Sequence, residues 1–336
     1  MASAANMTSS GVDADSMVAM DQRFQLIARV HQYIVPPIFA VIIITGLIGN
    51  LMVIYVILSR KKLQTVTNLL LMSLAISDVS FLLICGGFSV VHYVLSEWPL
   101  GDVLCRIIQY LLYVTCYVTV YTLIMVSAVR FLLVVYRDAA KKYCSKRNAT
   151  ILIIVTWLVF MVAKIPILIV HSEKDNARTG RRECIIVGET DGRRLFASFF
   201  VFAYALPLLV ICTLYLLILR HIRSKRSTAL NDQVSTNPST RNRHVTKCVV
   251  IVVLTFAVCW LPLHVHLLVA YYDRVPDTNL TYNVLLVLWQ ALSFLNSTLN
   301  PLIYNYFSKE FRKSFKSIMC CSEDSVYEYS TTPTQL

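Results

Sequence analysis

Polar side chains that could bind a cation occur inside segments of this sequence that are otherwise apolar. Asp78 is a carboxylate in the middle of one such segment, and a lone buried carboxylate must be protonated or must meet a cation or several hydrogen-bond donors. Oxygens and donors suited to a hydrated monovalent cation come from Asn50, Thr119, Asn296, Ser297 and Asn300. We predict that Asp78 and the last four of these form a sodium site. A protonated Asp78 hydrogen-bonded to asparagine is the alternative.

A further polar feature, Asn300 followed by Pro301, lies where a membrane helix would be most regular. Pro301 has no backbone N–H and clashes with the preceding turn, so the helix must kink or loosen there. In hydrocarbon the freed carbonyl needs a neighbouring side chain or a water as its partner. Polar groups at this depth usually belong to a mechanism, with a simple packing kink as the alternative.

The elements that position these residues are seven long apolar segments. The chain of 336 residues is 57% hydrophobic and 15% charged. Its mean hydropathy of +0.62 excludes an ordinary soluble domain. Each segment is long enough to cross about 30 Å of hydrocarbon as a helix. The segments are 33–58, 69–95, 107–135, 150–170, 195–219, 245–271 and 284–306. We predict an all-α membrane protein, a seven-transmembrane helix bundle with no catalytic constellation, and therefore not an enzyme.

Positively charged residues indicate the orientation of the bundle. Four clusters of Lys and Arg fall on one side of a seven-span topology, at 60–62, 137–147, 220–247 and 309–316. That side is cytoplasmic, so the net charge of +12 reflects topology and contact with membrane lipid, not nucleic acid. We predict a multi-pass protein of the plasma membrane with its N-terminus outside.

Three regions follow from this topology. They are an extracellular N-terminal tail (1–32), a seven-transmembrane domain (33–307), and an amphipathic helix with a cytoplasmic tail (308–336). Phe311 and Phe315, at i and i+4 among cations, indicate the amphipathic helix.

Cysteines and one asparagine predict covalent modifications. Cys105 begins the third span on the outer side and Cys184 lies in the outer loop after the fourth, so a disulfide between them is the economical inference. Cys320 and Cys321 follow the basic amphipathic stretch inside, where we predict palmitoylation, with two reduced thiols as the alternative. Asn6 begins a sequon in the outer tail and is the predicted glycosylation site.

Landmarks in all seven spans together resemble class A (rhodopsin-like) G-protein-coupled receptors. They are Gly49-Asn50, Leu74 to Asp78, Cys105, Trp157, Pro207 with Tyr215, Phe256 to Pro262, and Asn300 to Tyr304. Further stretches resemble the galanin and allatostatin-A peptide receptors: Glu97 to Gly101, Gln109-Tyr110, Tyr121 to Leu123, Lys146 to Thr150, and Trp260 to Val265. Leu112 stands where amine, opioid and somatostatin receptors carry an aspartate, which argues against those groups.

The resemblance implies an extracellular neuropeptide ligand, C-terminally amidated, and a heterotrimeric G protein of the inhibitory class, with arrestin as a further partner. Beyond the sodium ion, it implies no cofactor. The expected ligand contacts, in a cavity open to the outside, are Gln109, Tyr113, Arg182, His264 and His266. The expected activation switch consists of Phe256, Trp260, Pro262, Pro207 and Val120. The expected G-protein contacts are Arg130, Tyr215 and Tyr304.

Two departures from the family pattern accompany these agreements. The residue before Arg130 is Val129 where the family has an aspartate, and Asn242 replaces the other usual acidic partner. Either the receptor signals without ligand, or other polar groups and water restrain Arg130. The second departure is Gly86-Gly87, where related receptors have a proline. There we expect glycine flexibility to keep the kink.

Several alternatives stay open. The chain could be a receptor for another peptide, or a decoy or constitutively active receptor, given Val129. A transporter usually has repeated halves, and none is visible. An opsin needs a Schiff-base lysine in the seventh span, and 284–306 contains none.

The last residues, Pro333 to Leu336, suit strand addition to a PDZ domain, so a PDZ protein is a further expected partner.

Overall fold

The computed structural model describes residues 28–95, 97–175, 180–231, 240–272, 280–307 and 309–319, together with Gln22, Gln25 and Leu26. Three groups of predicted residues lie outside this part of the chain: Asn6, the pair Cys320 and Cys321, and the C-terminal residues 333–336. The side chain of Asn242 also lies outside the described residues. The expectations that rest on these positions remain predictions.

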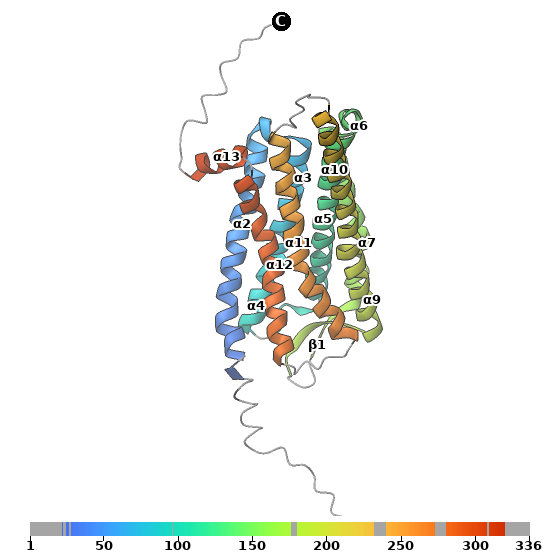
Figure 1. Cartoon of the computed structure of the whole chain (residues 1–336). Coiled ribbons are helices and arrows are strands. Elements are labelled where there is room, and N and C mark those ends of the chain that lie inside the picture. The colour runs from blue at the N-terminus through green and yellow to red at the C-terminus, as the bar shows by residue number, and fades with distance from the viewer. Residues whose placement is uncertain are drawn as a thin grey trace, which may run out of the picture.

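Seven helical rods run side by side and form the body of the molecule (Figure 1). Three of them contain a π-helical segment, labelled η1, η3 or η4, in which the helix is locally wider. In chain order the rods are η1 (Val30–Ile34) with α2 (Val35–Ser59); α3 (Val66–Phe81) with η3 (Leu82–Gly86) and α4 (Gly87–Leu95); α5 (Gly101–Val135); α7 (Lys146–Ala163) with α8 (Ile167–Val170); α9 (Glu189–Phe200) with η4 (Val201–Ala205) and α10 (Leu206–Asn231); α11 (Thr240–Tyr272); and α12 (Leu280–Phe307).

The first six rods are long and apolar enough to cross a membrane by length and composition. The seventh, α12, packs between α2 and α11 and closes the bundle. The predicted seven-helix bundle is therefore confirmed. Each span forms a helix because hydrocarbon offers no hydrogen-bond partners, so each backbone N–H and C=O must find its partner within the segment.

Three short helices lie at the end of the bundle that the charge distribution predicts to be cytoplasmic. They are η2 (Lys61–Leu63), α6 (Arg137–Tyr143) and α13 (Lys309–Met319). Helix α13 projects sideways from the end of α12 (Figure 1), and it buries Phe311 and Phe315. This confirms the predicted amphipathic helix after the seventh span. We call this end of the bundle the inner end and the opposite end the outer end.

A β-hairpin covers part of the outer end, where the sequence indicated only a loop. Strand β1 (His171–Asp175) pairs antiparallel with β2 (Arg182–Ile186), and Glu173 stands opposite Cys184. The backbone N–H of Trp98 donates to the Arg182 carbonyl at 2.8 Å, which ties β2 to the loop after α4. Within the described residues, the fold is all-α except for this hairpin.

The second rod contains a π-helical segment where related receptors have a proline. The segment η3 ends at Gly86, and a Cβ at that position would come within 2.8 Å of the Ile43 side chain on α2. Glycine therefore allows the first and second rods to approach closely at this point. A Cβ at Gly87 would meet no described atom within 4 Å, so only Gly86 is required by packing.

The fourth rod is interrupted near its outer end, and side chains of α5 bond to one carbonyl before the interruption and one after it. Pro166 has no N–H to donate, and the chain forms turns there between α7 and α8. The Tyr110 hydroxyl donates to the Met161 carbonyl at 2.8 Å, and Arg106 Nη1 donates to the Leu168 carbonyl at 2.8 Å. These bonds meet the need for backbone partners at membrane depth.

Candidate functional site

A polar cluster lies in the middle of the bundle, around Asp78 on α3. One oxygen of the Asp78 carboxylate accepts from Ser297 Oγ at 2.7 Å, and the other accepts from Asn300 Nδ2 at 2.8 Å. Asn50 Nδ2 donates to the Ser297 carbonyl at 3.0 Å and so joins α2 to α12. All four side chains are buried. The structure thus brings together three of the five residues of the predicted sodium site in direct contact.

The remaining two residues of that site lie beside the cluster. Thr119 on α5 shares a hydrogen bond of 2.9 Å with Ser77, the neighbour of Asp78 in the chain. Asn296 is buried one residue before Ser297 on α12. Within the described residues, the Oδ1 atoms of Asn50, Asn296 and Asn300 are buried and accept no hydrogen bond. Buried oxygens without donors next to a carboxylate fit a small cation, since each could serve as one of its ligands.

A continuous set of aromatic rings connects the outer end of the bundle to its middle. We call it the ring column; its members are Tyr113, Phe199, His264, Trp260 and Phe256. Phe199 lies between Tyr113 and His264, with ring centroids 5.0 and 4.6 Å away. Trp260 lies 6.1 Å from His264 and 6.2 Å from Phe256. All five side chains are buried, so a displacement of one ring must be met by its neighbours.

The inner part of the ring column, Trp260 and Phe256, supplies two of the five predicted switch residues. Trp260 and Phe256 lie on α11 within two turns of Pro262, which interrupts the helix hydrogen bonds. Tyr204 of the π-helical segment η4 donates from its hydroxyl to the Ala257 carbonyl at 2.8 Å, and its ring lies 6.0 Å from Phe256. The other two predicted switch residues, Pro207 and Val120, are buried.

The five predicted ligand contacts do not form one group in the structure. Tyr113 and His264 both belong to the ring column. His266 instead stacks on Tyr282 of α12, with centroids 3.7 Å apart, and Gln109 is half-buried on α5. Arg182 is exposed on β2 and forms an ion pair of 3.5 Å with Glu173. Sequence reasoning therefore named two residues that meet on the same ring and three that lie elsewhere.

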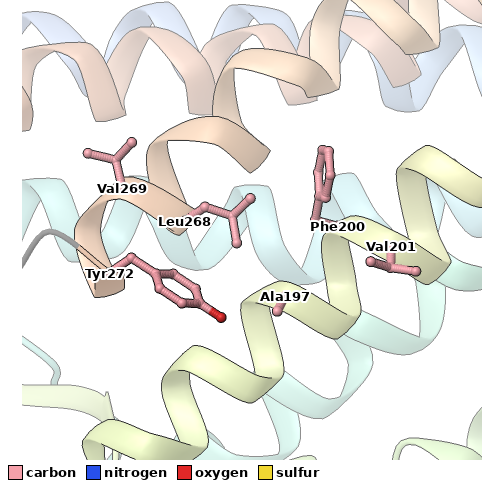
Figure 2. Close-up of a pocket in the computed structure, with 6 residues that line it drawn as sticks. All are labelled: Ala197, Phe200, Val201, Leu268, Val269 and Tyr272. Carbon is pink, nitrogen blue, oxygen red and sulfur yellow. The ribbon is translucent and has the colours of Figure 1, made fainter.

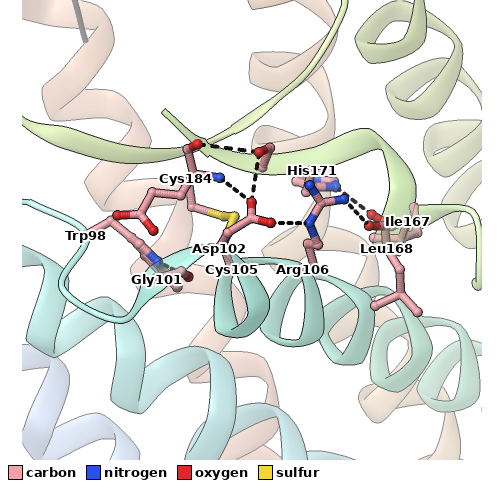
Figure 3. The surroundings of a disulfide bond; sticks show 11 residues. Trp98, Gly101, Asp102, Cys105, Arg106, Ile167, Leu168, His171 and Cys184 are labelled. Carbon is pink, nitrogen blue, oxygen red and sulfur yellow. Dashed lines mark hydrogen bonds and ion pairs between the residues drawn. A yellow bond between two sulfur atoms is a disulfide. The ribbon is translucent and has the colours of Figure 1, made fainter. Parts of the chain in front are cut away.

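The predicted disulfide is confirmed and is accompanied by a polar network (Figure 3). Cys105 and Cys184 are bonded, with their Cα atoms 5.5 Å apart. One turn before Cys105, the Asp102 carboxylate accepts from Arg106 Nε at 2.7 Å, from Ser172 Oγ at 2.8 Å and from the Glu173 N–H at 2.9 Å. We call Asp102, Arg106, Ser172 and Glu173 the outer clamp. It attaches β1 to α5, as the disulfide attaches β2.

His171 begins strand β1 next to the outer clamp. Its ring is buried, and Nδ1 lies 3.1 Å from the Ile167 carbonyl. Burial lowers the pKa of His171, so the ring is neutral at pH 7. Tyr113 of the ring column lies 6.3 Å from it. The hairpin therefore contacts the outer end of the ring column through an uncharged imidazole.

Residues 49–304 match the family described as "7 transmembrane receptor (rhodopsin family)". The chain belongs to this family. Seven helices, the disulfide from the third helix to the hairpin, and the central polar cluster make up one receptor domain. The resemblance seen in the sequence is confirmed, and the receptor is not an enzyme.

The receptor is similar along most of its length to an allatostatin-A receptor and to galanin receptors. It is 34% identical to the allatostatin-A receptor of Bombyx mori over 301 residues, which cover 88% of this chain and 82% of the relative. It is 32% identical to galanin receptor type 2 of Mus musculus over 288 residues, covering 85% and 76%. A galanin-like G-protein coupled receptor of Caenorhabditis elegans is 31% identical over 315 residues, covering 85% and 73%.

At the inner end of the receptor, the predicted G-protein contacts are largely covered. Arg130 and Tyr304 are buried, and Tyr215 is half-buried on α10. The Tyr304 ring lies 6.2 Å from Phe311 of α13. Val129, half-buried next to Arg130, packs against the apolar core.

Sequence reasoning missed two charged features of the receptor. The outer clamp had a visible signal, because Asp102 and Arg106 are spaced i and i+4 at the start of a helix. Lys164 had another, because a lysine within a span is rare. Its Nζ lies 3.3 Å from the centre of the Tyr117 ring, a cation–π contact between α5 and the end of α7.

Proposed function

We propose that this receptor binds an extracellular neuropeptide of the allatostatin-A and galanin type and activates a heterotrimeric G protein of the inhibitory class. The names of its relatives support the ligand class. The observation that carries the proposal is the ring column, because it connects the outer end, where a peptide arrives, to the switch residues on α11. A peptide that presses on Tyr113 or His264 changes the packing around Phe199 and Trp260.

The chemistry of the outer end suits a peptide with an aromatic or amidated end. Tyr113, His264 and Phe199 are buried in this arrangement, and once a peptide opens the outer end their ring faces and edges favour aromatic side chains. A C-terminal amide is neutral, and the five residues of the ring column are all uncharged aromatic side chains. Gln109, Arg182 and His266 are proposed as outer contacts that act once a peptide has entered.

Signal transfer requires a helix that can move. Pro262 removes one backbone hydrogen bond from α11 and provides a bending point between Trp260 and the outer end. A swing of the inner half of α11 would uncover Arg130, Tyr215 and Tyr304 for the G protein. A ligand drives this swing only to the extent that it binds the active arrangement more tightly.

A sodium ion at the polar cluster would favour the inactive arrangement. Asp78 supplies the negative charge, and Ser297, Asn300, Thr119 and Asn296 supply neutral oxygens. An ion that binds one arrangement only stabilises that arrangement as its concentration rises. Sodium and peptide are then expected to weaken each other's binding by the same factor.

Expression of the full chain in cultured cells tests the proposal. We would apply a panel of C-terminally amidated neuropeptides that includes allatostatin-A and galanin peptides, and record cyclic AMP and G-protein dissociation. An inhibitory receptor lowers stimulated cyclic AMP. If every peptide leaves both signals unchanged at verified surface expression, the proposed ligand class is wrong; if dissociation occurs without a fall in cyclic AMP, the proposed G-protein class is wrong.

Two neighbouring substitutions test the ring column itself. His264→Ala removes a buried ring, whereas Val265→Ala removes a side chain that is 46% exposed on the same helix turn. We expect His264→Ala to weaken an active peptide by about tenfold or more, because it loses ring contacts worth roughly 0.5–1.5 kcal/mol each. Val265→Ala should leave the concentration–response curve unchanged. Equal curves for both variants would remove the ring column from the mechanism.

A further inference from the structure

An apolar groove lies between the fifth and sixth rods on their outward-facing side, near the outer end. Its volume is about 310 Å³, and six residues line it: Ala197, Phe200, Val201, Leu268, Val269 and Tyr272. Figure 2 shows Leu268 and Tyr272 of α11 pointing toward Ala197 and Phe200. None of the predicted ligand contacts lines this groove, so it is separate from the proposed peptide site.

Two sets of contacts hold the rods together, one on the outer side of the groove and one on its inner side. On the outer side, Arg193 Nε donates to the Tyr271 carbonyl at 2.9 Å, and the Phe196 ring lies 4.7 Å from Tyr271. A Cβ at Gly192 would overlap the Tyr271 ring, so glycine permits this close approach. On the inner side, the Tyr204 hydroxyl donates to the Ala257 carbonyl. The groove is thus a gap framed by fixed contacts rather than a loose interface.

The groove opens toward the surroundings of the bundle at membrane depth. Val201 is 43% exposed, Val269 37% and Tyr272 54%, and all three lie in rods that can cross a membrane. A positive charge lies at the outer rim, where the Arg193 guanidinium is 5.9 Å from the Tyr272 ring centre. Arg194 is exposed beside it. An apolar slot with cations at its outer edge matches one acyl chain with a phosphate above it.

We propose that this groove binds the acyl chain of an outer-leaflet phospholipid, with the lipid phosphate next to Arg193 and Arg194. A second copy of the chain fits less well, because a stable protein interface needs roughly 20–30 residues a side, and six residues line the groove. A sterol would use the apolar slot but has no anionic group for the arginines. The two arginines therefore favour a phospholipid over a sterol.

Lipid retention by the purified full-length receptor tests this site without any ligand. The receptor would be moved from nanodiscs of palmitoyl-oleoyl phosphatidylcholine into detergent, and bound lipid counted by native mass spectrometry. Ala197→Trp places a ring in the groove. Leu209→Trp is the matched control, because Leu209 is 64% exposed farther along the same rod and does not line the groove.

We expect the parent and Leu209→Trp to retain one phospholipid, and Ala197→Trp to retain about tenfold less, the equivalent of about two buried methylenes. Val269→Trp fills the groove from the other rod and repeats the test if Ala197→Trp fails to fold. Nanodiscs doped with dioleoylglycerol or cholesterol test the phosphate, which both lack. Equal retention in all variants, preferential retention of either phosphate-free lipid, or a dimer in place of a lipid adduct would overturn the proposal.

Discussion

The two ends of helix α5 differ in how they are held. At the outer end, the Cys105–Cys184 bond and the outer clamp attach both strands of the hairpin. At the inner end, Arg130 follows Val129, an apolar side chain where the family has an acid. The same helix is therefore anchored where a ligand arrives and lacks the adjacent carboxylate where a G protein binds. We expect the outer end of α5 to stay in place when other helices move, because it carries these additional attachments.

The largest expected effect comes from releasing the outer end. Cys184→Ser opens a covalent loop spanning 79 residues, which the chain-entropy account values at about 4.5 kcal/mol. That value is an upper limit, because the spans remain in the membrane when tertiary contacts are lost. Thermal unfolding in detergent should shift downward by several degrees, and peptide binding should fall. Cys212→Ser, at an exposed free cysteine, is the control and should change neither. Unchanged unfolding of Cys184→Ser would mean that the outer clamp alone anchors the hairpin.

A carboxylate added at the inner end should reduce the contrast between the two ends. Val129→Asp places an acid next to Arg130, and a partly buried charge pair can shift a two-state balance by about tenfold. We expect lower ligand-free signalling at matched surface expression, with the maximal response to agonist retained. Val129→Asn has the same shape as Val129→Asp but adds no charge, so it is the control and should leave ligand-free signalling at the level of the parent. If ligand-free signalling of the parent already equals that of untransfected cells, basal activity is absent and the departure at Val129 is neutral.

The polar cluster around Asp78 on α3, which Thr119 adjoins from the middle of α5, tests whether the two ends of α5 communicate. Sodium that binds only the inactive arrangement should lower agonist affinity by about fivefold between sodium-free and physiological buffer. Asp78→Ala should abolish this dependence. Choline chloride in place of sodium chloride keeps the ionic strength constant and serves as the control. Identical sodium dependence in the parent and in Asp78→Ala would rule out the site.

The smallest expected effect comes from weakening the outer clamp while the Cys105–Cys184 disulfide stays intact. Asp102→Asn keeps the shape of the side chain but removes the charge that Arg106 and Ser172 contact. Hydrogen exchange of the β1 amides, Glu173 in particular, should become faster, with little change in thermal unfolding. The pair Asp138 and Lys141 is almost fully exposed, so Asp138→Asn is a matched control. Equal exchange in both variants would show that the clamp adds nothing to the disulfide.

The sequence predicted the parts of the receptor that depend on composition and membrane depth. Spans follow from hydropathy alone, and the disulfide follows from which cysteines face outward. The contacts of Asp78 with Ser297 and Asn300 were foreseen because polar side chains at equal depth in hydrocarbon must find each other. These inferences need only the depth of each residue.

Features that depend on the rotation of one helix against another were not predictable. His264 and His266 are two positions apart, yet the ring of His264 contacts Phe199 and that of His266 stacks on Tyr282. The rotation of α11 about its axis determines which neighbour each ring meets. In the first, second and fifth rods, π-helical segments rotate the following residues about the helix axis without a distinct residue pattern. The hairpin was missed because its strands are short and charged, with none of the usual apolar alternation.

The contact between Tyr304 and Phe311 gives the short helix α13 a role in the energetics of the inner end. Phe311 is 2% exposed, and the Tyr304 ring is part of what covers it. Any rearrangement that withdraws Tyr304 must find a new cover for Phe311 or expose it, at a cost of up to about 1.5–3 kcal/mol. The membrane surface offers such a cover, since an amphipathic helix can turn its apolar face into the lipid boundary. The lipid composition of the inner leaflet thereby enters the equilibrium between the arrangements of the receptor.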